Sequence, residues 1–116
     1  MHFKLIIALV REDKTDVILD AARAAGATGA TVLNQARGEG IIASKTFFGL
    51  NLETPRDMLM FLVEEHMCRE ILERIERIGE FERNTGSGIA FQIDVEDVVG
   101  VKRQVSKLSE TVEDKL

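Results

Sequence analysis

Trp and Tyr are absent from this 116-residue chain, and six Phe are its only aromatic side chains. So few rings offer little platform for stacking the bases of a single-stranded nucleic acid. An excess of positive charge is absent as well, because 15 Lys and Arg stand against 20 Asp and Glu, for a formal net charge of −5. A negative chain is repelled by nucleic-acid phosphates and by anionic membrane surfaces. Composition therefore predicts no nucleic-acid partner.

Cysteine and long apolar runs are also scarce. Cys68 is the only cysteine, so no disulfide can form within the chain. The apolar run FKLIIALV, residues 3–10, is too short to cross a bilayer, and no segment has the pattern of a secretory signal. We therefore expect a single domain in the reducing cytoplasm, without membrane insertion.

Hydrophobic periodicity predicts four strands and two helices. Alternation or a continuous apolar run indicates strands at residues 3–10, 30–37, 58–63 and 89–95. Helical spacing indicates one helix capped by Asp13 or Thr15 and closed by a left-handed Gly26, and a second that runs from Glu64 and Glu65 to Gly79. The order β-α-β-β-α-β is the ferredoxin-like arrangement of an α+β sandwich.

The first predicted strand is apolar on both of its faces. Two helices can cover only one face of the four-stranded sheet, so the other face must be buried in some other way. In a chain of this size another subunit would have to bury it, and we expect a homo-oligomer. Residues 104–116 follow the last strand, and three apolar residues at helical spacing there favour a tail or short helix.

No constellation for metal binding or catalysis stands out. His66 and Cys68 are two positions apart, so on a helix their side chains point in different directions. We therefore expect His66 to lie on the surface and Cys68 to be a buried, inert thiol, and no metal site is predicted. None of the serines has a His–Asp arrangement in the sequence, so no nucleophile is predicted either. These patterns favour a protein that is not an enzyme.

Two glycine-bearing turns are better candidates for a ligand site. They are ARGEG at residues 36–40 and TGSG at residues 85–88. Successive backbone N–H groups in such turns can form an anion-binding nest, although a plain tight turn is the alternative for each. A connection of about 15 residues without a clear element follows the first turn, and loops of that length are usually functional or disordered.

The motifs in their order resemble the PII-type nitrogen regulatory family. GATGATV is followed by a glycine-rich turn, a long loop, a buried strand, a helix, TGSGIAFQIDVEDVVGV and a basic pair, and the resemblance covers residues 3–103. It implies a domain at residues 1–103 that forms a ferredoxin-like homotrimer, with adenine nucleotides in the clefts between subunits. It also implies a loop, called the T-loop, at about residues 41–56 that docks onto a partner protein, for which a membrane transporter is one candidate.

Site residues follow from the same resemblance. The phosphate-facing turn is Gly86, Ser87 and Gly88, and the other expected nucleotide-binding residues are Thr31, Arg37, Gly38, Gly40, Val63, Lys102 and Arg103. The partner-binding residues of the T-loop are Ser44, Lys45, Thr46, Phe47 and Phe48.

Several positions depart from the family pattern, and most departures remove positive charge. Ile89 stands where a lysine follows the glycine turn, Gly100 where an arginine is expected, and Asp57 where a lysine is expected near the start of the third strand. Burying a triphosphate needs several paired cations, and the expected cleft retains three. We therefore expect AMP, ADP or a comparable small anion as the effector rather than ATP with 2-oxoglutarate.

Other families share this arrangement of elements. A CutA-type trimeric cation-tolerance protein is the alternative, although it needs a metal constellation that two scattered histidines hardly supply. An acylphosphatase would need a glycine-rich, arginine-bearing loop after the first strand, and a regulatory domain of the ACT type is usually attached to an enzyme.

Overall fold

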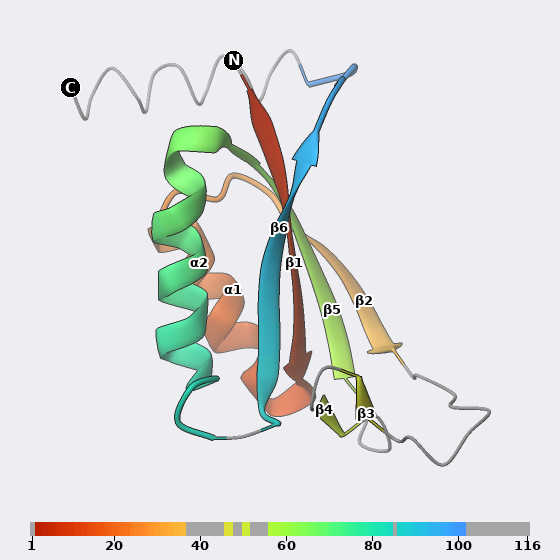
Figure 1. The fold of residues 1–116 in the computed structure, drawn as a ribbon, viewed down its shortest axis with the longest axis vertical. Coiled ribbons are helices and arrows are strands. Elements are labelled where there is room, and N and C mark those ends of the chain that lie inside the picture. The colour runs from red at the N-terminus through yellow and green to blue at the C-terminus, as the bar shows by residue number, and fades with distance from the viewer. Residues whose placement is uncertain (1, 37–45, 48–49, 52–55, 85, 102–116) are drawn as a thin grey trace.

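The computed structural model describes residues 2–36, 46–47, 50–51, 56–84 and 86–101 (Figure 1). Its main sheet contains four strands, β1 (Phe3–Arg11), β2 (Thr31–Ala36), β5 (Arg56–Glu64) and β6 (Gly88–Val95). A 3-10 turn, η1 (Glu12–Lys14), leads into α1 (Thr15–Ala24), and α2 (Glu65–Gly79) follows β5. A small second sheet pairs β3 (Thr46–Phe47) with β4 (Leu50–Asn51), inside the segment expected to form the T-loop.

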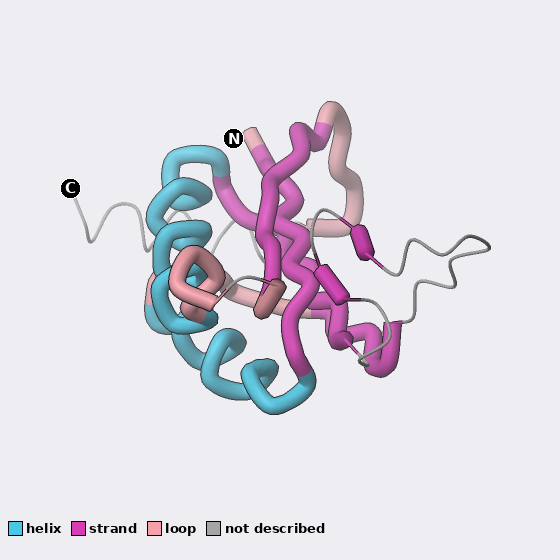
Figure 2. The backbone as a smooth tube through the Cα atoms, turned by 60° about the horizontal axis from the view of Figure 1, so that its bottom comes forward, coloured by secondary structure: helices cyan, strands magenta, loops and turns pink. Residues whose placement is uncertain are grey.

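The strand order in the main sheet is β2-β5-β1-β6, and every neighbouring pair is antiparallel. Each helix therefore connects two parallel strands that have one antiparallel strand between them. The first helix connects β1 to β2, and the second connects β5 to β6. Both helices lie on the same side of this sheet, as the second view also shows (Figure 2). This arrangement confirms the predicted α+β, ferredoxin-like fold.

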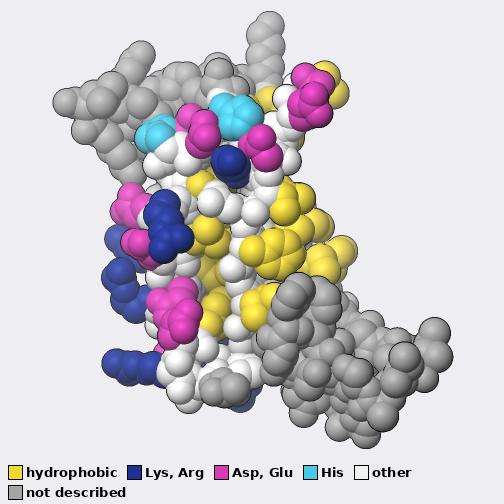
Figure 3. All heavy atoms as spheres, in the orientation of Figure 1, with side chains coloured by type: hydrophobic (Ala, Val, Ile, Leu, Met, Phe, Trp, Pro, Cys, Tyr) yellow, Lys and Arg dark blue, Asp and Glu magenta, His cyan; other side chains and the backbone are white. Residues whose placement is uncertain are grey.

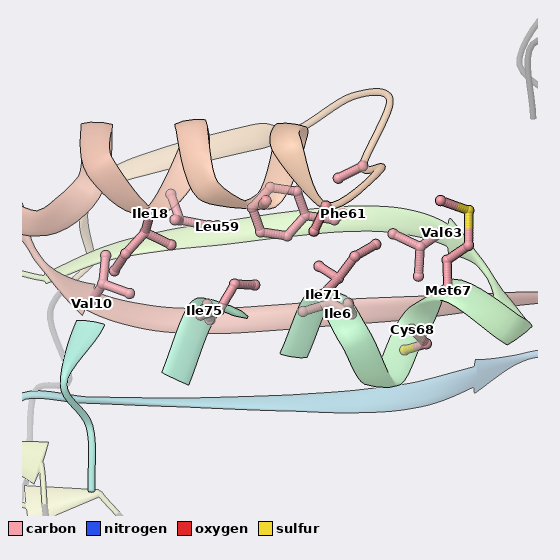
Figure 4. Packing of buried hydrophobic residues seen from close by; sticks show 14 of the residues in the cluster. Ile6, Val10, Ile18, Leu59, Phe61, Val63, Met67, Cys68, Ile71 and Ile75 are labelled. Carbon is pink, nitrogen blue, oxygen red and sulfur yellow. The ribbon is translucent and has the colours of Figure 1, made fainter. Parts of the chain in front are cut away.

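The core fills the space between the helices and the sheet (Figure 4). Four of its residues, from two strands and both helices, have no exposed surface: Ile6, Phe61, Ile18 and Ile71. Alternation along a strand places every second residue of β1 and β5 in this layer. Cys68 lies in the same cluster with 2% exposure, as its helical spacing predicted.

Most of the predicted element boundaries hold, but the start of α1 differs. The residue at the N-cap position is Lys14, which makes no side-chain cap, so the prediction of a cap at Asp13 or Thr15 was wrong. Thr15 is the first helical residue, and its hydroxyl instead donates to the Asp57 carboxylate at 2.6 Å. Gly26 has a φ of 117°, which agrees with a glycine that closes the helix.

The second helix ends at Gly79, as predicted, but the left-handed residue is the next one, Glu80, with a φ of 56°. At the other end Glu64 precedes the helix and caps it, because its carboxylate accepts from the His66 N–H at 2.9 Å. The strand before it, β5, begins two residues earlier than the apolar run indicates, so Arg56 belongs to the sheet.

The sheet face opposite the helices, called the open face below, is strongly apolar. It carries Leu5, Ile7, Met58, Met60, Ile89 and Phe91 at successive register positions of three neighbouring strands. Leu33 and Ile93, on the two outer strands, are 48% and 45% exposed. Hydrophobic side chains gather on the side of the molecule away from the helices (Figure 3). Neither helix covers this face, which fits the apolar second face predicted for β1.

Candidate functional site

Four strand ends meet at one end of the sheet, where the glycine turn before β6 also lies. The register pairs Arg11 with Arg56, Val10 with Gly88, and Ala36 with Arg56. The last residues of β1 and β2 are thus brought beside the first residues of β5 and β6. This end, called the turn end below, contains Gly86, Ser87 and Gly88 of the TGSG motif and, among the described residues, Arg11 and Arg56.

Arg56 is the central side chain of the turn end. It is 3% exposed. Its Nη1 donates to the carbonyl oxygen of Ser87 at 2.6 Å, and its Nη2 donates to that of Gly86 at 2.6 Å. Burial lowers the pKa of Arg56, as does the positive charge of Arg11, while Asp13 acts in the opposite direction. The guanidinium therefore holds two consecutive carbonyl groups of the turn.

Hydrogen bonds within the turn fix it from the other side. The Ser87 N–H donates to the Asn84 carbonyl at 3.0 Å, and the Asn84 N–H donates to the Glu80 carbonyl at 2.9 Å. The Ser87 hydroxyl also donates to the Glu80 carbonyl, at 3.3 Å. Gly86 has a φ of 81°, a backbone conformation that glycine adopts more readily than other residues. At least one N–H of the predicted nest is thus used within the turn itself.

Close packing explains the glycine at the start of β6. A Cβ at Gly88 would lie 2.4 Å from the ring of Phe81 and 2.9 Å from the carbonyl oxygen of Leu9. A Cβ at Gly79 would lie 2.3 Å from the same ring. Phe81 therefore packs over both glycines, so the glycines have a structural reason whether or not the turn binds a ligand.

Asp57 and Arg56 are neighbours in sequence, but their side chains make hydrogen bonds on opposite sides of the sheet. Asp57 is 6% exposed and accepts from Thr15 at the start of α1, whereas Arg56 reaches the turn. Side chains alternate between the faces of a strand, so only one of two consecutive residues can reach this turn. The cation at the start of β5 is thus Arg56, one position before the Asp57 that stands in place of the expected lysine.

Only part of the predicted nucleotide site comes together within one chain. Thr31 is exposed and pairs with Met60, four residues along β5 from Arg56, which corresponds to about 13 Å at about 3.3 Å per residue. Val63 lies seven residues from Arg56, about 23 Å along the same strand on that spacing. It is 2% exposed, in the core. The predicted residues Arg37, Gly38, Gly40, Ser44, Lys45, Phe48, Lys102 and Arg103 lie outside the described residues, while Thr46 and Phe47 form β3.

The histidines and the cysteine lie at the opposite end of the sheet or in the core. His2 Nε2 contacts Asp94 Oδ1 at 2.5 Å, and Lys4 Nζ lies 3.2 Å from the same oxygen. Cys68 Sγ donates to the side chain of Gln92 at 2.6 Å, and burial raises the pKa of this thiol.

Across the described ranges, no three or more His, Cys, Asp or Glu side chains group as metal ligands. No helix in the part of the chain that the structure describes is long and apolar enough to span a bilayer.

Sequence reasoning missed Arg56 and Arg11 as members of the turn end. The sequence pattern places Arg56 at the end of the loop expected at about residues 41–56, because the apolar run begins only at Met58. The sequence does hold one signal for these arginines. Arg11 directly follows the predicted strand 3–10, and an antiparallel neighbour that extends beyond its apolar run sets Arg56 opposite Arg11. The three cations expected for the cleft therefore include neither of these arginines.

Comparison with known proteins gives a consistent result. The family model of the nitrogen regulatory protein P-II matches residues 3–105. The apo form of CPII from Thiomonas intermedia K12, a nitrogen regulatory PII-like protein, is 20% identical over 82% of this chain and 90% of that chain, with a TM-score of 0.62.

Two further solved structures share the fold. A PII-like signaling protein from Thermus thermophilus is 23% identical over 82% of this chain and 87% of that chain, with a TM-score of 0.60. CPII from Thiomonas intermedia K12 bound to ADP, AMP and acetate is 22% identical over 83% of this chain and 90% of that chain, with a TM-score of 0.59. No curated protein sequence matches the chain.

Proposed function

Because the chain belongs to the nitrogen regulatory protein P-II family, we propose that it is a non-catalytic regulator that binds AMP or ADP and signals this binding to a partner protein. The nucleotide, or a comparable small anion, would bind in clefts between the subunits of a homotrimer. The observation that carries this proposal is the turn end, where a buried Arg56 holds the glycine turn next to a second arginine.

A phosphate group suits the chemistry of this end of the sheet. Glycine turns offer backbone N–H donors, and arginines supply the charge that a buried phosphate requires. The charge beside the phosphate would come from Arg37, Lys102 and Arg103, which the family pattern predicts, while Arg56 would hold the turn through its carbonyl groups. In support, CPII, which has the same fold at 22% identity, has been solved with ADP and AMP bound.

Assembly into a trimer would complete the site and cover the open face. Full burial of one large apolar side chain contributes about 1.5–3 kcal/mol, and the open face carries such side chains on all four strands. Thr31 and Val63 lie far from the turn in their own chain. A cleft between subunits would let the exposed Thr31 of one chain approach the turn of the next, whereas the side chain of Val63 lies in the core of its own chain.

Control of a partner would run through the T-loop at about residues 41–56. Within it, Ser44, Lys45, Thr46, Phe47 and Phe48 would form the contact surface, and the family resemblance suggests a membrane transporter as the partner. The protein itself would work in the cytoplasm. The match of the P-II family model over residues 3–105 favours this proposal over the cation-tolerance alternative.

Isothermal titration calorimetry tests the nucleotide proposal. AMP, ADP, ATP and cyclic AMP would be titrated with and without Mg²⁺ and 2-oxoglutarate. We expect micromolar binding, with AMP or ADP at least as tight as ATP. Tight Mg²⁺–ATP binding that 2-oxoglutarate strengthens would overturn the preference for AMP or ADP. The absence of any heat of binding with every nucleotide would overturn nucleotide binding itself.

Light scattering after size exclusion tests the trimer. The wild-type protein should have three times the mass of the chain, and Phe91→Asp should shift it to the monomer, because the charge would stand on the open face beside Ile7. Ile78→Asp is the matched control, since Ile78 is 40% exposed on α2 and not on the sheet. A trimer that survives Phe91→Asp would show that the open face is not the interface.

A further inference from the structure

We propose that Arg56 is a positioning residue for the phosphate-binding turn, and that it acts through the carbonyl groups of Gly86 and Ser87. The inference rests on the proposed function, because it assigns the turn to the phosphate of the nucleotide. It concerns a residue that holds the turn, not one that replaces the cations of the cleft.

The geometry of the contact carries the argument. A guanidinium is a rigid planar fork, and here its two terminal nitrogens reach two consecutive carbonyl oxygens, each at 2.6 Å. Peptide groups are planar, and no described peptide is cis. Fixing the carbonyls of Gly86 and Ser87 therefore also fixes the directions of the N–H groups that follow them, those of Ser87 and Gly88.

A glycine turn needs such a partner more than most segments do. Gly86 lacks a side chain and has a φ of 81°, so its backbone has many alternatives in an unrestrained loop. Ordering a backbone residue costs conformational entropy, and a turn that is ordered before the ligand arrives avoids this cost on binding. Arg56 is well suited to the task, because it starts a strand that is hydrogen-bonded on both sides.

The sheet transmits this restraint to the neighbouring strands. Arg56 stands opposite Arg11 in β1 and opposite Ala36 in β2. Its neighbour Asp57 is bound to Thr15 at the start of α1. The first two residues of β5 thus hold the turn on one side of the sheet and α1 on the other, so the position of the turn is set by the most central part of the fold.

Three variants separate positioning from charge. Arg56→Lys keeps the charge but has a single ammonium group, which lacks the planar fork that spans two carbonyls. Arg56→Gln removes the charge as well. Arg11→Gln is the matched control, because it removes a charge from the same end of the sheet, while the Arg11 side chain donates to Asp13 at 2.9 Å.

The variants would be compared by calorimetry with AMP, ADP and adenosine, and by amide hydrogen exchange of Ser87 and Gly88. We expect both Arg56 variants to lose about tenfold or more in affinity for AMP and ADP and much less for adenosine. Exchange at the turn should accelerate while the core of α2 stays protected. Arg11→Gln should stay within about threefold of wild type, since it leaves the turn in place.

Other outcomes overturn the inference in distinguishable ways. If Arg56→Lys binds AMP as the wild type does, the charge matters and the fork does not. An equal loss for adenosine and AMP would indicate general destabilisation rather than positioning. Should Arg56→Gln fail to fold, Arg56→Lys alone decides between these results. A wild-type protein that binds no nucleotide would remove the proposed function, and the inference with it.

Discussion

Replacing Gly88 with alanine should destabilise the fold by overpacking the turn end. The added Cβ would lie 2.4 Å from Cε1 of Phe81 and 2.9 Å from the carbonyl oxygen of Leu9. Carbon atoms in favourable contact are about 3.5–4.0 Å apart, so both neighbours must move. The ring has little room, because it also packs against Gly79, and the Leu9 oxygen belongs to the backbone of the central strand β1.

The size of the effect follows from the cost of overpacking. Inserting one extra carbon into a well-packed site typically costs about 1–3 kcal/mol. Unfolding entropy is about 2.1 cal/mol/K for each residue, so for 116 residues one kcal/mol corresponds to about 4 °C. We therefore expect Gly88→Ala to lower the Tm by about 4–12 °C.

Gly29→Ala is the matched control for this substitution. A Cβ at Gly29 would meet no heavy atom within 4 Å. Both substitutions restrict the unfolded chain equally, so their difference isolates the packing at Gly88. The control should stay within about 2 °C of the wild type, as surface substitutions usually do.

Calorimetric or fluorescence-dye melts at one fixed protein concentration would make the comparison, because the Tm of an oligomer depends on concentration. Equal Tm values for Gly88→Ala and Gly29→Ala would refute the packing of Phe81 on Gly88. Adding Phe81→Leu to Gly88→Ala should recover part of the loss. Without recovery, the obstacle is the Leu9 carbonyl rather than the ring.

Two further predictions concern polar contacts away from the turn. Thr15→Val should lower the free energy of unfolding in urea by about 1–3 kcal/mol, because it removes a hydroxyl that donates to the buried Asp57, while Thr15→Ser should retain most of it. Hydrogen bonds from His2, and then from Lys4, hold the pKa of Asp94 below its usual value. The ionised form is therefore favoured in the folded state, and its contribution is present above about pH 4 and lost as the pH falls through the lower, folded pKa. Asp94→Asn should flatten this part of the pH dependence in guanidinium melts between about pH 2 and 6, and an unchanged slope would contradict the assignment.

Local patterns predicted the elements well where one physical preference dominated. The alternation from Ile89 to Val95 and the helical repeat of Met67, Ile71 and Ile75 each need only one apolar face, and both elements lie where predicted. The predictions failed where a polar side chain had two possible partners. Asp13 or Thr15 was expected to cap α1, but neither does, and a carboxylate 42 positions away accepts the hydroxyl of Thr15.

The start of β5 shows the same limit. Arg56 and Asp57 are charged, so the apolar run that predicts this strand begins only after them, at Met58. Both side chains are nevertheless almost fully buried. Burial of charged groups is tolerated because their partners are supplied by distant segments. The Arg56 contacts come from a turn about thirty residues later in the chain, and no local signal announces such a pair.

By itself the sequence determined the order of strands and helices, the apolar second face of the first strand and the resemblance to the P-II family. These depend on periodicity and on short motifs, which are local properties of a chain. The tertiary structure decided which cation serves the glycine turn and which polar group meets Asp57. Those choices depend on register, which sets Arg11 opposite Arg56 and Val10 opposite Gly88, and register is decided only when all four strands pack together.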